Sequence, residues 1–413
     1  MKEYKLIFSI YLTFLFVFSV FFLSAIHNSP VNNSMHEWVI NYQGGFTRRG
    51  FFGEIIFQLS QIFNFQLKKI FLILQIILYA GYFYSIYLLF KNVKYNYFFA
   101  IAIFSPLFFV FSLAELEALG RKDILMFLIF IINFLIYLKF KNINYNYIYF
   151  TITFPIVFLT HEIYIIYSVY FLAFFVILEK KLNLIFFFKF LIIIFYLFLF
   201  VEFIVSNEFT KENLQLLCEN LKNKSNVVCG LAPYSMIIDI NIYQSELNWF
   251  TPHRDGDWKY SYIIRYILIF IFGFLGLIIL IIFSKIDNEK TNKIVSKINL
   301  KSIFILLALP SILPFLTAVD SGRYMSMAYT FPCIFYFGLY RAGIIFVDYE
   351  KINFILSNSL LKLKKYKIIF LILLCFSWSP KAVYHEDISS FPLYRMITKS
   401  SDFISNFENF SSY

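Results

Sequence analysis

The chain has 413 residues, of which 60% are hydrophobic, 23% aromatic and only 15% charged. This composition excludes an ordinary soluble domain and is typical of an integral membrane protein. The formal net charge of +11 does not indicate a nucleic-acid partner, because the lysines are distributed between the apolar runs and do not gather on one polar segment.

The predicted elements are membrane-spanning helices, and we expect one integral membrane domain over residues 1–413. A helix needs about 20 apolar residues to cross a hydrocarbon core roughly 30 Å thick. The first run, 6–26, is longer than a signal-peptide core and lacks a small-residue cleavage site, so we interpret it as a retained helix. Ten further spans bring the prediction to about eleven in an all-α polytopic fold: 69–90, 97–113, 124–140, 147–160, 163–178, 185–206, 261–284, 303–319, 327–347 and 367–379.

Lysines set the predicted orientation. Five lysine-bearing connections alternate with lysine-poor turns and fall on the same side as Lys2 and Lys5, which marks that side as cytoplasmic. Lys68 and Lys69 are the exceptions, and we interpret them as residues that snorkel to the headgroups. With an odd number of spans, the tail 380–413 lies on the outer side, so we expect a multi-pass membrane protein with a cytoplasmic N-terminus.

Arginines follow the opposite distribution. A guanidinium is planar and suits phosphate and carboxylate groups, whereas an ammonium is a point charge. The split indicates that lysine sets the topology and that arginine binds something anionic outside. Six of the eight arginines fall on the predicted outer face: Arg48, Arg49, Arg121, Arg254, Arg323 and Arg395.

Two outer segments are long enough to hold structure of their own. In the first, 27–68, apolar residues recur at helical spacing over 51–67, which predicts an amphipathic helix in the membrane interface, with an extension of the second span as the alternative. The second, 207–260, is polar and contains Cys218 and Cys229. A disulfide between them would suit an oxidising periplasm, and the spacing leaves it open.

The first charged island, 41–54, has the sequence N-Y-Q-G-G-F-T-R-R-G-F-F-G-E. Glycine permits close backbone approach, so we expect Arg48 and Arg49, supported by Gly44 and Gly45, to bind a diphosphate. The alternative is that the two arginines only bind lipid headgroups. Glu54 is the last residue of this island, and we expect it to be a further supporting residue.

The second island, A-E-L-E-A-L-G-R-K-D, forms a tight outer turn. Charges so close to hydrocarbon are expected to be paired or functional. A carboxylate crowded by others has a raised pKa, as a general acid or base needs, so Glu115, Glu117 and Asp123 are candidates for catalysis. Arg121 and Lys122 are candidates for phosphate binding. The alternative is a solvated cap over a helical hairpin.

Two smaller islands complete the predicted site. His161 and Glu162 occupy a very short outer turn, where they are candidates for proton transfer, with a structural histidine as the alternative. Arg323 lies in D-S-G-R-Y, either as a phosphate ligand or as the local ion-pair partner of Asp320.

No spacing of Cys and His indicates a zinc site, and Cys333 and Cys375 fall in apolar runs where packing explains them. We expect no cofactor, and the sequence leaves a divalent metal open.

The G-G-F-T-R-R-G-F-F-G-E, G-R-K-D, H-E and D-S-G-R stretches, together with the layout, resemble bacterial envelope-polysaccharide proteins: O-antigen and capsule polymerases and GT-C-type glycosyltransferases. The resemblance implies a GT-C-like layout, a place in the bacterial inner membrane with a periplasmic C-terminus, and an undecaprenyl-linked saccharide as substrate. It further implies contact with membrane lipid and polysaccharide-assembly proteins as partners. It also implies an outer-face carboxylate as base, and in the first outer segment that acid is Glu37 or Glu54. A lipid-linked sugar flippase or transporter and a non-catalytic membrane subunit are the alternatives.

Overall fold

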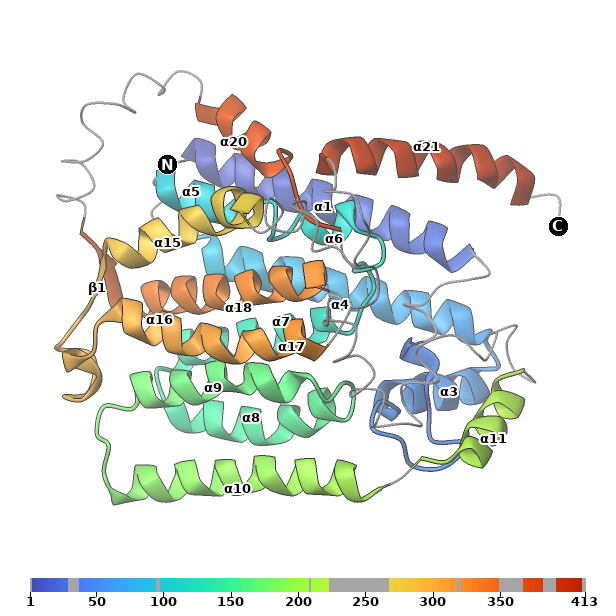
Figure 1. Cartoon of the computed structure of the whole chain (residues 1–413), viewed down its shortest axis with the longest axis horizontal. Helices are drawn as coiled ribbons and strands as arrows, with labels where there is room; N and C mark the ends of the chain where they lie inside the picture. The colour runs from blue at the N-terminus through green and yellow to red at the C-terminus, as the bar shows by residue number, and fades with distance from the viewer. Residues whose placement is uncertain are drawn as a thin grey trace, which may run out of the picture.

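The computed structural model describes residues 2–28, 37–93, 97–207, 209–222, 267–317, 321–348, 367–381 and 391–410, and it is mostly helical (Figure 1). The first half contains α1 (Lys2–Asn28), α3 (Phe51–Phe63), α4 (Leu67–Phe90), α5 (Tyr97–Ile103), α6 (Phe111–Ala114), α7 (Asp123–Phe140), α8 (Ile143–Phe158), α9 (Tyr164–Leu178), α10 (Leu184–Ser206) and α11 (Lys211–Lys222). The second half contains η1 (Ile269–Phe274), α15 (Leu275–Ile282), β1 (Ser284–Ile286), η2 (Val295–Lys297), α16 (Leu300–Ala308), η3 (Leu309–Ser311), α17 (Ile312–Thr317), α18 (Ser321–Ala342), β2 (Ile345–Val347), α20 (Lys367–Cys375) and α21 (Pro392–Phe410).

Four of the described helices are long and apolar enough to cross a membrane: Lys5–His27, Leu67–Phe90, Asp123–Phe140 and Leu184–Ile204. They confirm the helices predicted over 6–26, 69–90, 124–140 and 185–206. On α10, large apolar side chains such as Ile192 and Phe195 stay more than half exposed, which suits a helix face in contact with hydrocarbon. The described chain therefore has the character of a helical protein embedded in a membrane.

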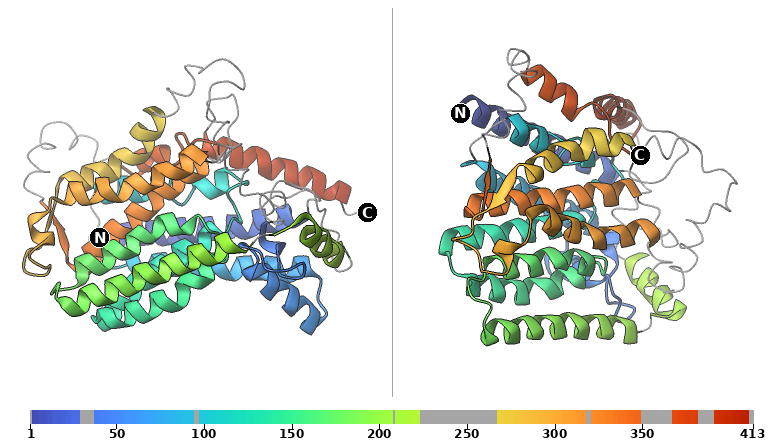
Figure 2. Two further views of the ribbon diagram at one scale, coloured as in Figure 1. Left: turned by 60° about the horizontal axis from the view of Figure 1, so that its bottom comes forward. Right: turned by 60° about the vertical axis from the view of Figure 1, so that its left-hand side comes forward.

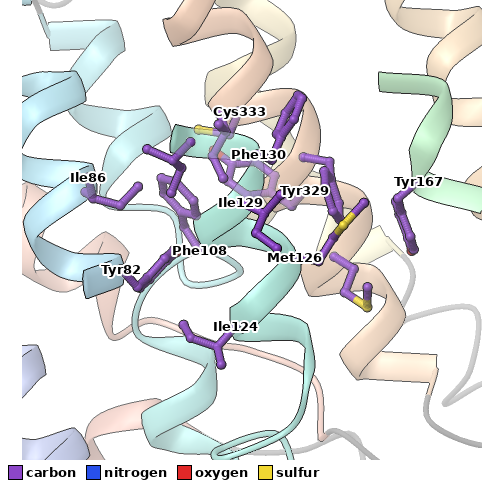
Figure 3. Packing of buried hydrophobic residues seen from close by; sticks show 14 of the residues in the cluster. Tyr82, Ile86, Phe108, Ile124, Met126, Ile129, Phe130, Tyr167, Tyr329 and Cys333 are labelled. Atoms are coloured by element: carbon purple, nitrogen blue, oxygen red, sulfur yellow. The ribbon is translucent and has the colours of Figure 1, made fainter. Parts of the chain in front are cut away.

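The long helices run side by side (Figures 1 and 2). Helix α4 packs against both α1 and α7, and α7 packs in turn against α8 and α18. Phe130 of α7 is fully buried, with its ring centroid 4.9 Å from that of Phe171 and 5.5 Å from that of Phe331. Close-packed aromatic pairs of this kind hold α7, α9 and α18 together, and Figure 3 shows Phe130 and Tyr329 within this buried packing. The three helices begin at the same end of the bundle, since Asp123 of α7 contacts both Tyr164 of α9 and Arg323 of α18.

Proline interrupts two of the predicted spans. The run 97–113 forms the short helix α5 and then a series of turns, because Pro106 has no N–H for a helical hydrogen bond. In the run 303–319, the turn of η3 around Pro310 separates α16 from α17. The predicted span 261–284 is described from residue 267 onwards, where the π-helical η1 leads into α15.

The predicted span 327–347 begins earlier and ends earlier. Helix α18 starts at Ser321, so Arg323 lies in its first turn and not in a connecting loop. At the other end, Gly343 has φ 73° and its N–H donates to Tyr340, while the N–H of Ile344 donates to Leu339. This is a Schellman motif, which stops a helix at a left-handed glycine. The chain then forms β2, which pairs with β1 antiparallel, an element that the sequence pattern did not predict.

The amphipathic helix predicted over 51–67 forms as α3 and ends four residues earlier than expected. Asn64 caps it in the left-handed conformation, with φ 51°. Ile56 and Phe57 are buried, whereas Ile62 and Phe63 stay exposed beyond the bundle.

Candidate functional site

The turn before α7 is fixed by buried polar groups from two distant segments. The carbonyl of Gly120 accepts hydrogen bonds from Trp38 Nε1 and, at 2.7 Å, from Gln75 Nε2, while its N–H donates to the Tyr79 hydroxyl at 3.1 Å. Gly120 has φ 77°, and a Cβ there would meet Gln75 Nε2 at 2.7 Å. Only glycine suits such a position without strain. The segment that follows is therefore rigidly placed.

The two side chains after Gly120, Arg121 and Lys122, reach distant segments of the chain. Arg121 Nη1 donates to Glu37 Oε2 at 3.1 Å, and its Nε donates to the Glu117 carbonyl. Lys122 Nζ donates to the carbonyls of Arg49 and Thr160, each at 3.0 Å. One turn thus connects the first long segment after α1 with the end of α8.

Lys122 is completely buried. Burial lowers its pKa to about 8, since a charged ammonium loses its hydration there, while the nearby carboxylates of Glu37 and Glu162 oppose that effect. A buried lysine with this pKa is still mostly protonated at neutral pH. It therefore adds a positive charge to its surroundings.

Arg48 and Arg49 both reach Glu162, which lies 113 residues after Arg49 in the chain. Arg49 Nη2 lies 2.6 Å from Glu162 Oε1, and its Nε lies 3.0 Å from Oε2. Arg48 Nε lies 3.5 Å from the same Oε1. Burial alone would raise the pKa of Glu162, but the guanidiniums, Arg49 above all, hold it well below its usual range.

Glu37 and His161 form the centre of this arrangement. The Glu37 side chain is almost fully buried, with Oε2 bound by Arg121 and Oε1 lying 3.4 Å from His161 Nε2. The N–H of Ile163 donates to His161 Nδ1, so the proton of the neutral ring is on Nε2, the ring nitrogen that lies near Glu37. Burial would raise the pKa of Glu37, yet Arg121 and further cations lower it strongly, so the carboxylate stays ionised.

His161 remains neutral at physiological pH. Burial lowers its pKa well below the usual value, and the guanidinium of Arg49 lowers it further. Glu162 Oε2 lies 3.6 Å from the ring Nδ1, so the imidazole stands between two carboxylates.

Asp123 and Arg323 join the first turns of α7 and α18. Arg323 Nε lies 2.6 Å from Asp123 Oδ2, and Nη2 lies 2.7 Å from Oδ1. The Tyr164 hydroxyl adds a third contact, at 3.3 Å. Arg121, Asp123 and Arg323 also line a cavity of about 40 Å³ with aromatic walls, large enough for water.

We call nine residues the charged cluster, because each has a close contact or an electrostatic interaction with another member: Glu37, Arg48, Arg49, Arg121, Lys122, Asp123, His161, Glu162 and Arg323. Five of them are cations, three are carboxylates and the histidine is neutral. The cluster therefore carries a surplus of two positive charges at the end of the bundle where α7, α9 and α18 begin.

Glu115 belongs to a separate pair. Its carboxylate binds the guanidinium of Arg395 on α21, which also donates to Ser379, and Lys399 of α21 donates to the Ala114 carbonyl. Glu115 and its partner are both buried. The C-terminal helix is thereby attached to the turn that leads to Gly120.

The remaining predicted site residues lie elsewhere. Glu117 is exposed. Glu54 accepts from the N–H of Tyr42 and from Gln43 and Gln58, all within or next to its own segment.

Gly44 and Gly45 pack against Asn213 of α11, where a Cβ on Gly44 would meet the Asn213 carbonyl at 2.0 Å. Asp320 lies outside the described residues. Cys218 is disulfide-bonded, and Cys229 also lies outside them.

The sequence named two residues of these contacts without selecting them for the site: Glu37, given only as an alternative to Glu54, and Arg395, given only as one of the outer arginines. Glu37 directly precedes Trp38, Val39 and Ile40, which are all buried. An acid followed at once by three apolar residues within a polar segment is a signal of burial that could have marked it. Arg395 was one of several arginines outside the spans, and its partner is 280 residues away.

Among the described residues, no group of three or more His, Cys, Asp or Glu side chains has the proximity to hold a metal ion. No protein-family model, curated protein or solved structure matches the chain.

Proposed function

We propose that the charged cluster is the active site of a membrane glycosyltransferase. Its substrate is a saccharide linked to a polyprenyl phosphate or diphosphate, used during assembly of an envelope polysaccharide such as O-antigen or capsule. One observation carries the proposal: cations from three distant segments meet at one end of an apolar helical bundle with two charges in surplus. A phosphate attached to a lipid has to be bound at that depth, beside the hydrocarbon.

The proposal includes the topology expected from the sequence: about eleven spans in the inner membrane, a cytoplasmic N-terminus and the cluster at the periplasmic face. In its support, Lys139 lies in the last turn of α7 and Lys141 caps its end, while the cluster lies at its beginning. Lys285 on β1 lies at the end of the bundle opposite α3 (Figure 1). Helix α3 follows α1 as the interfacial helix does in a GT-C layout.

In the proposed reaction, the oxygen of an acceptor hydroxyl attacks the anomeric carbon of the donor sugar. The bond from that carbon to the phosphate oxygen breaks, and the electron pair leaves with the phosphate. Arg48, Arg49 and Arg121 stabilise the charge that develops on the leaving group. The hydroxyl proton passes to a carboxylate, and Glu37 is the best candidate because, unlike Glu54, it lies inside the cluster.

The contact between Arg121 and Glu37 determines when Glu37 can accept the proton. While Arg121 is bound to Glu37, the carboxylate is a weak base, since its pKa is held low. Arg121 is the more exposed of the two side chains. When it turns to a donor phosphate, the pKa of Glu37 rises, so that binding of the donor activates the base.

The test uses the full-length protein in vesicles with a radiolabelled polyprenyl-diphosphate-linked saccharide and an acceptor saccharide. Wild type forms a new glycosidic bond, and the double variant Arg48→Ala/Arg49→Ala loses at least 100-fold of the rate. Arg341→Ala is the matched control, because Arg341 lies in the last turn of α18, away from the cluster. Undiminished transfer by the double variant removes the phosphate role, and transbilayer movement without a new bond favours the flippase.

A further inference from the structure

A long groove lies between α1 and α21, outside the charged cluster. Its walls are Phe14, Val17 and Phe21 on one side and Met396, Ile397 and Ile404 on the other, and its volume is about 890 Å³. Ser400 and Ser401 are the polar residues that line it, and no charged side chain of the described residues does so. The ring of Phe22 meets that of Phe403 at 6.2 Å beside the groove.

The walls of the groove are exposed apolar surface. Helix α1 is long and apolar enough to cross the membrane, and the groove is lined by its central turns, from Phe14 to Phe21. Val17 remains 56% exposed and Ile397 60% exposed, which would be costly in water and is expected beside lipid. Helix α21 runs beside α1 in Figure 1, and the residues of α21 that line the groove extend from Leu393 to Ile404.

One short segment connects this groove to the charged cluster. On one side, Ala114 and Glu115 bind Lys399 and Arg395 of the groove helix α21. On the other, the same segment continues through Ala118 to Arg121, which line the cavity beside Asp123 and Arg323. A chain lying in the groove is therefore led toward the cations of the cluster.

We infer that this groove holds the isoprenoid chain of the lipid-linked substrate, an inference that rests on the proposed function. The residues from Leu393 to Ile404 span about 17 Å at 1.5 Å per residue, which suits a linear chain better than the face of a globular partner. The uncharged lining accepts hydrocarbon, while the cluster beyond the connecting segment accepts the phosphate. The groove would make the protein prefer long polyprenyl chains over short ones.

The experiment compares two probes with the same headgroup, undecaprenyl phosphate and geranyl phosphate, binding to full-length protein in phosphatidylcholine nanodiscs. The variant Val17→Trp/Ile397→Trp fills the groove, and the single Ile397→Trp variant is used if the pair lowers thermal stability. Ile77→Trp is the matched control, since Ile77 of α4 is also 60% exposed and does not line the groove.

Wild type and the control are expected to bind the long-chain probe at least tenfold more tightly than the short one. The groove variant should lose that preference and still bind geranyl phosphate like wild type. A preference that survives groove filling overturns the inference, and so does equal displacement of the long-chain probe by phosphatidylglycerol.

Failure of the proposed function gives a different result. In that case Arg48→Ala/Arg49→Ala binds both probes as wild type does, whatever the groove variants show. If Arg48→Ala/Arg49→Ala no longer binds either probe while the groove variant keeps the chain-length preference, the phosphate role of the cluster stands. Only the inference about the groove is then overturned.

Discussion

Asp123 and Arg323 form a buried two-point ion pair although 200 residues separate them in the chain. Asp123 is the first residue of α7 and Arg323 lies in the first turn of α18. Since both helices are packed through aromatic side chains further along, the pair fixes their ends at the charged cluster. It also keeps Arg323 beside the cavity that Arg121 lines.

Removal of one partner should therefore lower the free energy of unfolding. Asp123→Ala leaves a buried guanidinium without its carboxylate, and we expect that free energy to fall by about 3–5 kcal/mol. The double variant Asp123→Ala/Arg323→Met should recover at least half of that loss. Unfolding in detergent measures the stability of both variants.

The control is Asp348→Ala, since its partner Lys285 is 57% exposed. That change should cost less than about 1 kcal/mol. Equal losses for Asp123→Ala and Asp348→Ala would contradict the structural role of the buried pair.

Gly120→Ala should disturb the cluster without touching any charge. The positive φ and the contact at 2.7 Å with Gln75 strain any side chain there, and a cost of about 1–3 kcal/mol is expected. Gly81→Ala is the control, because its Cβ would meet Leu128 methyl groups at ordinary distances of 3.5 Å and beyond. Thermal unfolding separates the two, and a Gly120→Ala protein as stable as wild type would refute the anchoring role of this turn.

Much of the helical architecture could be predicted from the sequence, because a span of about 20 apolar residues has one physical explanation. Helices α1, α4, α7 and α10 follow from that rule. Its failures are local: Pro106 breaks one apolar run, and Gly343 ends α18 before the run does.

The sequence indicates which residue types form the site, but it does not indicate which of these residues pair with one another. The sequence indicates that Arg49, Arg121 and Arg323 serve an anion or a carboxylate, but their partners lie 113, 84 and 200 residues away. Such pairing depends on how the helix ends meet, which periodicity does not encode. For the same reason, Glu37 and Glu54 could be separated only by their contacts.

Arg49→Lys tests whether the planar guanidinium matters. Lysine keeps the charge and loses the two-point contact with Glu162, so we expect transfer to fall about tenfold or more. Arg341→Lys, at the other end of α18, should leave the rate unchanged. Steady-state transfer rates decide, and equal rates for the two variants would mean that charge alone suffices.

The pH dependence of donor binding should report on Lys122. Its folded pKa of about 8 lies below the ordinary value of 10.5, so the destabilising cost of its charge is fully present below pH 8 and disappears as pH rises toward 10.5. Above pH 8 the cluster also loses one of its two surplus charges. A polyprenyl phosphoryl sugar keeps its charge in this range, and its binding should weaken roughly threefold to tenfold between pH 7 and 9.

Lys122→Met should bind the donor more weakly at pH 7 and show a flat profile between pH 7 and 9. His161 contributes no transition near pH 6.5, because its pKa is lowered well below that value. A wild-type profile that is also flat between pH 7 and 9 would exclude Lys122 as a contributor to anion binding.

The most direct measurement is single-turnover transfer by Glu37→Gln and Glu54→Gln, each saturated with the lipid-linked donor. Glutamine keeps the size of the side chain and removes its basicity, and general-base catalysis contributes about 10²- to 10⁴-fold. We predict that Glu37→Gln binds the donor and forms product at least 100-fold more slowly, while Glu54→Gln retains the wild-type rate. Wild-type rates from Glu37→Gln, or no product from wild type with any lipid-linked saccharide, would contradict an active site at the charged cluster.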